Sequence, residues 1–525
     1  MSQTARRLLI LSAVTLGVLL LFPLVSGSAV TLYTDWLWFD SLGQLSAFRT
    51  RILSQIVLWA AGASVVLGFL AANWFFLPRW LLGSFELRIQ RERGQSITIG
   101  KRLLAVTLSM VAVLVALTMA SAAAGQWAMA LRFIHASPFG LSDPVFSFDV
   151  GFYVFSMPFY RFLLSWTTSL IVVTFAGNAL IYIFAGRVRD SGAVGHLSVL
   201  GSLFLVSRAV GYQLQRWELL QASTGLMHGA GYTDVHARMP LLSILTVVVA
   251  LGTLGLLVNI WIRRWRLLLG VAGAWVAIGL VVQVYPTAVQ RFTVEPNELA
   301  LERPFIEHNI RFTRYAYGLD AVQEFDYPTS GTLTLQDLQD NQDTLSNVRL
   351  WDWKPLRATY EQIQEIRTYY TFADIDIDRY MVDDRLQQVN LAVRELDIEQ
   401  MREDARTWIN QHLIYTHGYG LCLSPVSEVS EEGLPRLLVR NIPPRSERPA
   451  FEITRPEIYF GEKTTAYAIV NTTEDEFDYP SGDLNVYTRY QGAAGVPMGG
   501  PLRRAALALR FNSPPIFLSN AIGAD

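Results

Sequence analysis

The sequence changes character at Tyr285 and Pro286. Before this point it contains several long runs with few or no charged residues, and after it no apolar run is as long. A helix needs about 20 apolar residues to cross the hydrocarbon core of a bilayer. We therefore predict an α-helical membrane bundle over residues 1–286, followed by a soluble mixed α/β domain of the α+β class over residues 287–525.

Seven runs of spanning length predict about seven transmembrane helices. Their approximate bounds are 8–25, 52–76, 103–123, 162–185, 193–214, 241–262 and 267–284. The first run follows Arg6 and Arg7, as in a signal peptide, but it is long for that role and lacks a clear small-residue cleavage site. We interpret it as a membrane helix. The fifth run is less apolar than the others and contains Arg208.

Positive charges divide the connecting segments into two sets. The N-terminus and the segments 77–102, 186–192 and 263–266 together hold 13 Lys and Arg, whereas the longer opposite segments hold only six. Cytoplasmic loops are enriched in Lys and Arg. The pattern therefore predicts a plasma-membrane protein with a cytoplasmic N-terminus and, after seven crossings, an extracytoplasmic C-terminal domain. If the run containing Arg208 did not cross, that domain would be cytoplasmic.

Composition excludes several classes of protein. Residues 1–286 carry 20 Lys and Arg against 9 Asp and Glu, whereas residues 287–525 carry 23 against 36, and neither part has the basic patch typical of nucleic-acid binding. Cys422 is the only cysteine, which excludes a disulfide scaffold and a metal site built on a cysteine cluster. We predict no cofactor. The expected partners are the lipid bilayer and other envelope components, with the oligomeric state left open.

The domain after residue 286 is predicted to mix helices and strands. Pro304 and Gly318 are expected at the start and the end of one helix. Further expected elements are an amphipathic helix near 356–367, a strand, turn and returning strand from residue 374 onward, a helix over 401–412, and short strands across 435–490.

The segments that follow the first and third apolar runs are rich in aromatic residues. They read TDWLWFDSLG and SPFGLSDPVFSFDVGFYVFSMPFY. Aromatic rings with a polar edge are favoured at the headgroup level of a bilayer. We expect these outer segments to form an aromatic collar beneath the C-terminal domain.

Two polar features of the membrane part are candidate sites. Arg208, Tyr212 and Gln215 are spaced to share one face of the fifth helix, and an intramembrane cation usually faces a partner or an aqueous path. Alternatively, Arg208 lies near the helix end and extends to the interface. Asp234 and His236 lie in a glycine-rich outer loop and could bind a cation or transfer a proton. The alternative is a tight turn in which both side chains are structural.

His308 and His417 are the candidate residues of the C-terminal domain, and a structural role is the alternative for both. The acidic stretch that begins at Asp374 does not match an EF-hand, because its sixth and twelfth positions are Arg379 and Arg385. We therefore predict no metal site. The sequence contains no HExxH, GxSxG, P-loop or CxxC motif. Catalytic residues are left unassigned, and the sequence leans against an enzyme.

Several long strings occur in one order along the chain. They are DWLWFDSLG, GLSDPVFSFDVGFYVF, GAGYTDVHARMP, PFIEHNIRFTRYAYGLD, RTWINQHLIYTHGYG, RPEIYFGE and EFDYPSGD. Together they resemble the uncharacterised protein family one-eighty-two. The resemblance implies a multi-pass bacterial or archaeal membrane protein with seven helices and a large extracytoplasmic domain, and it supplies no catalytic residue. Members typically continue beyond the segment similar to ALRFNSPPIFLS, so the C-terminal domain of this chain is expected to be truncated.

Three functions remain open. The first is an envelope-associated binding or scaffold role for the acidic outer domain. The second is a transporter or channel component that uses the polar face of the fifth helix. The third is a membrane-bound enzyme that modifies envelope lipid or polysaccharide, which would need two titrating groups brought within hydrogen-bond reach.

Overall fold

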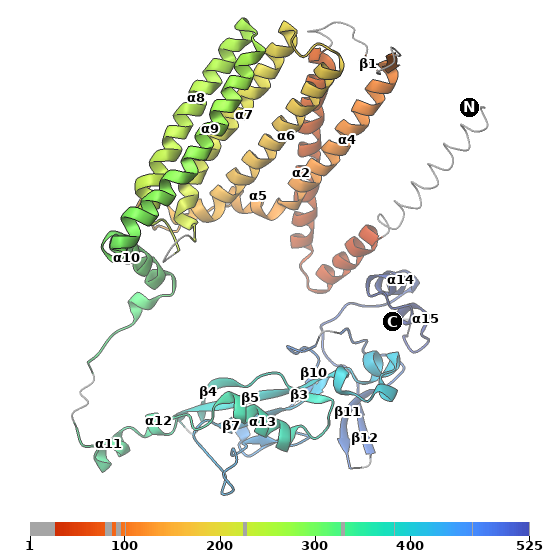
Figure 1. Ribbon diagram of the computed structural model, residues 1–525. Helices are drawn as coiled ribbons and strands as arrows, with labels where there is room; N and C mark the ends of the chain where they lie inside the picture. Colours follow the sequence, from red (N-terminus) through yellow and green to blue (C-terminus); the bar gives the residue numbers. More distant parts are fainter. Residues whose placement is uncertain are drawn as a thin grey trace. The chain divides into compact units, whose positions relative to one another are not determined.

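The computed structural model describes residues 27–78, 87–90, 96–99, 101–223, 228–326, 331–382, 384–464, 466–482 and 484–523 (Figure 1). The chain divides into two compact units. One, here called the helical unit, comprises residues 46–325, and the other, the strand-rich unit, comprises residues 1–45 and 326–525. The boundary expected at residue 286 concerns where the chain leaves the membrane, and it stays a prediction. By packing, the chain divides at residue 325.

The helical unit is built from long helices. They are α2 (Leu45–Ala71), α4 (Lys101–Gly125), α5 (Trp127–Ile134), α6 (Met157–Phe184), α7 (Ser191–Glu218), α8 (Met239–Ile262), α9 (Trp265–Val289) and α10 (Glu298–Ala316), with a hairpin of β1 (Leu87–Gln90) and β2 (Ser96–Ile99). Within the described ranges, six helical segments are long and apolar enough to cross a membrane. They coincide with six of the seven predicted runs. The run over 8–25 lies outside the described residues.

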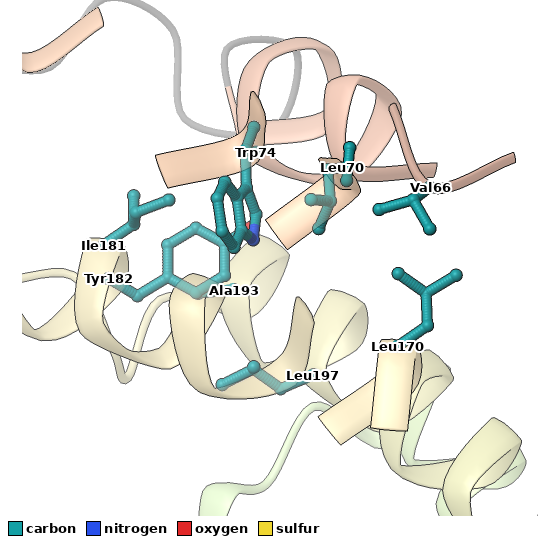
Figure 2. Close-up of a cluster of buried hydrophobic side chains, with 10 residues drawn as sticks. Val66, Leu70, Trp74, Leu170, Ile181, Tyr182, Ala193 and Leu197 are labelled. Carbon is teal, nitrogen blue, oxygen red and sulfur yellow. The ribbon is translucent and has the colours of Figure 1, made fainter. Parts of the chain in front are cut away.

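The membrane-length helices pack through small and apolar side chains. Val66, Leu70 and Trp74 at the end of α2 and in the turn after it are buried with side chains of α6 and α7 (Figure 2). Gly177 on α6 lies under the Trp74 ring, and a Cβ there would stand 2.6 Å from it. Gly62 meets Ala120 of α4 in the same way, at 3.4 Å. Close approach at small residues is how helices associate in a bilayer, where lipid is as apolar as leucine.

One polar side chain sets the turn between α8 and α9. Asn259 is fully buried, and its Oδ1 accepts a 2.9 Å hydrogen bond from the backbone N–H of Arg264. Arg263 between them has a left-handed backbone with φ of 59°. The Asn259 carbonyl also accepts the Arg263 N–H at 2.7 Å. The helix therefore ends at a fixed residue, and the chain returns at once into α9.

The strand-rich unit has one larger antiparallel sheet, two small ones and several helices. The larger sheet has six strands, all paired antiparallel, in the order β3-β5-β7-β8-β9, with β4 also paired to β5. Its strands are β3 (Tyr370–Phe372), β4 (Asp376–Val382), β5 (Arg385–Leu396), β7 (Leu421–Pro425), β8 (Val439–Arg440) and β9 (Arg445–Ser446). Two small sheets pair β6 (Gly418–Tyr419) with β10 (Glu457–Ile458) and β11 (Glu476–Ser481) with β12 (Leu484–Thr488). The helices are residues 27–41, α11 (Leu335–Asp340), α12 (Gln342–Leu345), α13 (Trp353–Gln364), α14 (Pro501–Arg510) and α15 (Pro515–Leu518).

Local patterns of the sequence account for much of this unit. Leu356 and Tyr360 of α13 are fully buried against the sheet, as the helical spacing predicted. The strand, turn and strand expected after residue 374 are β4 and β5, and Asp384 makes the turn with φ of 58°. Short strands also fill the stretch from 435 to 490.

Three expected elements differ from the structure. Pro304 does not begin a helix but lies inside α10, which starts at Glu298. The helix expected over 401–412 is instead a short 3₁₀ turn at Glu403–Ala405 followed by a π-helical turn at Asn410–Ile414. The Arg406 guanidinium donates to the Met401 carbonyl at 2.7 Å, so that side chain–backbone bonds replace the helical ladder there. The string TDWLWFD, expected in a connecting segment, belongs to helix 27–41.

Candidate functional sites

Two of the three residues of the polar face predicted on the fifth run, Arg208 and Tyr212, contact each other on α7. The Arg208 guanidinium lies over the Tyr212 ring, 5.3 Å from its centroid, and the Tyr212 hydroxyl accepts a 2.9 Å hydrogen bond from Trp275 Nε1 of α9. Within the part of the chain that the structure describes, Arg208 Nε is buried without a hydrogen-bond partner. The aromatic ring therefore provides the main contact that stabilises this cation.

Gln215, the third residue of that face, lines a pocket of about 650 Å³ at the end of the helices. Arg161, Glu218 and Arg238 contribute charged groups to its wall. Arg161 Nε lies 3.3 Å from Glu218 Oε1, and the Arg161 side chain is largely exposed. The pocket thus has both charged and apolar groups in its wall, and its exposed ion pair contributes little to stability.

The glycine-rich loop is held against α10 by a buried carboxylate. Both oxygens of Glu302 accept from the backbone N–H of Tyr232, at 3.1 and 3.0 Å. A Cβ on Gly231 would stand 2.8 Å from Glu302 Oε2, so a larger residue there would displace the carboxylate. Asn309 of α10 adds a 2.6 Å bond from Nδ2 to the His228 carbonyl. None of these long-range contacts was anticipated from the sequence.

The side chains of Asp234 and His236 have different partners and do not contact a common residue in the hydrogen bonds and ring contacts described below. Asp234 is buried, and its Oδ1 accepts a 2.6 Å bond from Arg238 Nη1. His236 is exposed and stacks on Tyr232, with ring centroids 4.1 Å apart. His308 lies half-buried on α10, and His417 belongs to the other unit. Among the described residues no group of three or more His, Cys, Asp or Glu is placed to hold a metal ion.

Sequence reasoning missed a histidine inside the helical unit. His196 of α7 is buried, with Nδ1 2.6 Å from the Tyr182 hydroxyl of α6 and Nε2 2.9 Å from Asn73 Oδ1. Asn73 in turn donates from Nδ2 to the Phe69 carbonyl at 2.7 Å. Each side chain of this network is hydrogen-bonded, so it joins three helices through polar contacts. An ionisable residue at such depth is a functional candidate by its cost alone.

A second cluster lies in the strand-rich unit, around His417. Tyr419 pairs with Glu457 across β6 and β10, so their side chains share one face of the ladder. The His417 ring lies 4.8 Å from the Tyr459 ring, measured between centroids. The Tyr459 hydroxyl donates to Glu476 Oε2 of β11 at 2.9 Å. The cluster therefore joins β6 to β10 and β11, which follow it in the sequence by about 40 and 60 residues.

Three polar atoms of this cluster have no hydrogen-bond partner among the described residues. They are His417 Nε2, Glu457 Oε2 and Asp478 Oδ1, all buried and without a hydrogen bond to any residue that the structure describes. Glu457 Oε2 forms an ion pair with Arg455, whose Nε lies 3.6 Å away, beyond hydrogen-bond distance. Buried polar groups are normally paired, so three orphaned atoms in one cluster need an explanation.

Burial changes the titration of these side chains. Burial, together with the smaller effect of the nearby Glu457 carboxylate, raises the pKa of Asp478 to about 6. Burial lowers the pKa of His417, against the opposing effects of its bond to the Gly418 carbonyl and of the Glu476 and Glu457 carboxylates. At neutral pH the cluster therefore holds a neutral imidazole among carboxylates.

The neighbouring core contains a buried cation. Arg394 of β5 is fully buried, and its Nε and Nη2 donate to the Gln364 carbonyl at 2.7 Å and to Gln364 Oε1 at 2.8 Å. Nη2 also lies 3.1 Å from Cys422 Sγ. Burial raises the pKa of the Cys422 thiol to about 11, although Arg394 opposes the shift. The lone cysteine is thus a core residue of low reactivity.

Comparison with known proteins shows which family the chain resembles along most of its length. A family model described as Uncharacterised protein family (UPF0182) matches residues 11–525. A UPF0182 protein of Pelotomaculum thermopropionicum is 40% identical over 96% of this chain and 57% of its own length. One of Desulforamulus reducens is 39% identical over 95% and 56%, and one of Cupriavidus necator is 40% identical over 96% and 57%. No solved structure matches the chain.

The chain thus spans little more than half the length of these relatives. The matched stretch takes up nearly the whole of this chain and gives no support to the expected truncation of its C-terminal domain. The order of the strings quoted above and the match over residues 11–525 both indicate the same family. This chain belongs to the uncharacterised protein family UPF0182.

Proposed function

We propose that the chain is a plasma-membrane protein that acts by binding an envelope ligand outside the cytoplasm, with its helical unit as the anchor. Six apolar helices of membrane length support a multi-pass protein. The excess of Lys and Arg in alternate connecting segments supports a cytoplasmic N-terminus. The acidic character of residues 287–525 suits a soluble domain.

The observation that carries the binding role is the orphaned set of His417 Nε2, Glu457 Oε2 and Asp478 Oδ1. Two of the three are carboxylate oxygens, so the missing partner is a donor of hydrogen bonds. Tyrosine rings lie around them: Tyr419 and Tyr459 contact His417. Aromatic faces and carboxylates suit a ligand with ring hydroxyls and amines, such as an amino sugar of an envelope polysaccharide. The Glu457 side chain is 16% exposed, which leaves the ligand an approach from that side.

A glucosamine oligomer with free amines tests this role. The full-length chain in detergent should bind it, and Asp478→Asn and His417→Gln should each weaken binding roughly 10- to 100-fold, because each removes a charge-assisted or buried hydrogen bond. Binding should also weaken as the pH falls through about 6, because Asp478 then becomes protonated and no longer attracts the amine. Titration calorimetry at several pH values measures both effects.

His308→Gln is the matched control, since His308 lies on α10 in the other unit and should bind the oligomer as the wild type does. An N-acetylated oligomer, which lacks the amine charge, should bind more weakly and without the dependence on Asp478. Equal affinity of the wild type and Asp478→Asn would remove the cluster from the binding role. Failure of the wild type to bind either oligomer would reject an amino sugar as the ligand class.

The side of the membrane is tested by a single introduced cysteine. Glu432 lies in an exposed turn after β7, and the native Cys422 is buried and should stay unlabelled. We expect a membrane-impermeant maleimide to label Glu432→Cys in intact cells. The control Arg189→Cys, in the segment between α6 and α7, should be labelled only after the cells are opened. The reverse result would place the strand-rich unit in the cytoplasm and end the envelope role.

The second candidate is a transporter or channel component, and the observation that favours it is the His196–Tyr182–Asn73 network. This network replaces Arg208 as the strongest intramembrane candidate, because it is both buried and ionisable. Transport of protons through it predicts that His196→Gln abolishes proton flux into vesicles that contain the protein. A binding role predicts no flux in either protein.

A further inference from the structure

An apolar pocket lies between helix 27–41 and the C-terminal helices of the strand-rich unit. Its volume is about 540 Å³. Its wall is mostly apolar and includes Trp38, Ala468, Met498, Leu507, Phe511 and Ile516. The deeper wall belongs to a hydrophobic cluster that includes Leu507 and Ile516, so the pocket opens onto the core rather than onto a polar surface. A cavity of this size and lining suits an apolar chain.

A cation stands at the rim of this pocket. Arg510, the last residue of α14, donates from Nη1 to Thr31 Oγ1 at 3.0 Å, and its Nη2 lies 3.5 Å from Asp35 Oδ1. The Arg510 side chain is 42% exposed. Its contacts with helix 27–41 are few and open to solvent, so the guanidinium can also contact an anion from outside.

The position of helix 27–41 in the sequence relates this pocket to the bilayer. The apolar run 8–25 ends two residues before that helix begins. Thr31 follows the end of the run by only six residues. Because the run 8–25 is predicted from the sequence to cross the bilayer, we expect Thr31, and with it Arg510, near the headgroup layer that borders the hydrocarbon core.

The surface beside the pocket has the composition of a membrane-contacting helix. Leu502, Leu509 and Leu518 of α14 and α15 are each about 70% exposed. Arg503 and Arg510 lie on the same short helix. Exposed leucines next to arginines on an amphipathic helix are typical of an element that lies in the interface of an anionic bilayer. Single exposed leucines are common, but three on adjacent helices beside an apolar pocket are not.

We propose that this pocket takes one acyl chain of a bilayer phospholipid, with the phosphate of the headgroup on Arg510 and the leucines of α14 and α15 in the surrounding lipid. The apolar wall matches the chain, and the cation at the rim matches the phosphate. The site holds the strand-rich unit at the membrane surface independently of any ligand bound at the His417 cluster.

Photolabelling tests the site on the full-length chain. The protein is reconstituted in vesicles of phosphatidylcholine and phosphatidylglycerol, with a trace of phosphatidylglycerol that carries a diazirine in its acyl chain. After illumination, peptide mapping should find label on Trp38, Met498 and Phe511. Ala468→Trp places an indole in the pocket and should lower that label roughly 4- to 15-fold, because it displaces one or two methylene groups. Arg510→Gln should lower it as well.

Two matched variants and a folding check accompany these. Ala493 is exposed and does not line the pocket, so Ala493→Trp should be labelled like the wild type. Arg402→Gln controls for the loss of one positive charge, because Arg402 is 83% exposed and does not line the pocket, and it should be labelled like the wild type. Cys422 should stay unreactive in every variant, which shows that the core is intact. Equal labelling of Ala468→Trp and the wild type overturns the proposal. So does label confined to α2–α9, or a cross-link at these residues between two copies of the chain.

Discussion

Replacement of Arg394 by alanine is expected to lower the free energy of unfolding of the strand-rich unit by about 3–5 kcal/mol. The side chain is fully buried, lies 5.6 Å from the Phe372 ring centroid and fills the space next to Cys422. Truncation leaves a large cavity and removes the donor that the Gln364 carbonyl accepts from. The cavity and the lost hydrogen bonds both lower stability, because the site is closed and water cannot replace the missing side chain.

Arg394→Met separates packing from charge. Methionine keeps much of the volume but none of the hydrogen bonds, so it should cost less than alanine, by about 1–2 kcal/mol. Among the described residues the groups that interact electrostatically with Arg394 are Cys422 and Tyr370 rather than a carboxylate, so the protein gains no ion pair in return for burying the cation. Replacing a buried charge by an apolar side chain of similar volume is often tolerated for that reason.

Urea unfolding of the full-length chain in detergent, followed by maleimide labelling of Cys422, measures these differences. The thiol is buried in the folded unit and becomes reactive when the unit opens. Arg402→Ala is the matched control, since Arg402 is 83% exposed and pairs with Asp404 at 2.6 Å on the surface. It should change stability by less than about 0.5 kcal/mol. A loss below about 1 kcal/mol for Arg394→Ala would show that the guanidinium is dispensable in the core.

Local sequence patterns were enough to predict most of the elements. Six apolar runs could be predicted as membrane-length helices, because hydropathy and length are properties of each segment alone. The buried stripe of α13 and the β4–β5 hairpin likewise follow from spacing within a dozen residues. Pro304 was misjudged because a proline fits the first turn of a helix by local rules, whereas the structure carries α10 back to Glu298.

The sites depended on contacts that no local pattern contains. His196 meets Asn73 across 123 residues, and Glu302 meets Tyr232 across 70. The His417 cluster left no comparable trace. His417 lies outside β6, and the pairing of β11 with β12 shifts register between Phe477 and Tyr479, so simple alternation does not predict which side chains of this stretch share a face. Which pairs meet in space could be learned only from the fold.

The aromatic segment before α6 leads to the second large effect. Asp143 is buried, and its carboxylate accepts from the backbone N–H groups of Val145, Phe146 and Phe148, at 2.9, 2.6 and 2.8 Å, and from the Tyr153 hydroxyl at 2.9 Å. The segment packs on the end of α7, where Arg216 lies over Phe146 and Trp217 contacts Phe148. One carboxylate thus fixes the loop that contacts the same end of α7 as Gln215 and Glu218.

Asp143→Ala should therefore destabilise the helical unit by about 3–5 kcal/mol, because it orphans several donors at once. Thermal unfolding of the full-length chain in detergent should show a melting temperature roughly 6–15 °C lower. Asp143→Asn keeps the shape but places an amide N–H₂ against donors, so about half of the loss should remain. Asp40→Asn, at an exposed position near the end of helix 27–41, is the matched control and should melt like the wild type. If Asp143→Ala melted within about 2 °C of the wild type, the loop would be held by its aromatic contacts, and the end of α7 would not depend on this carboxylate.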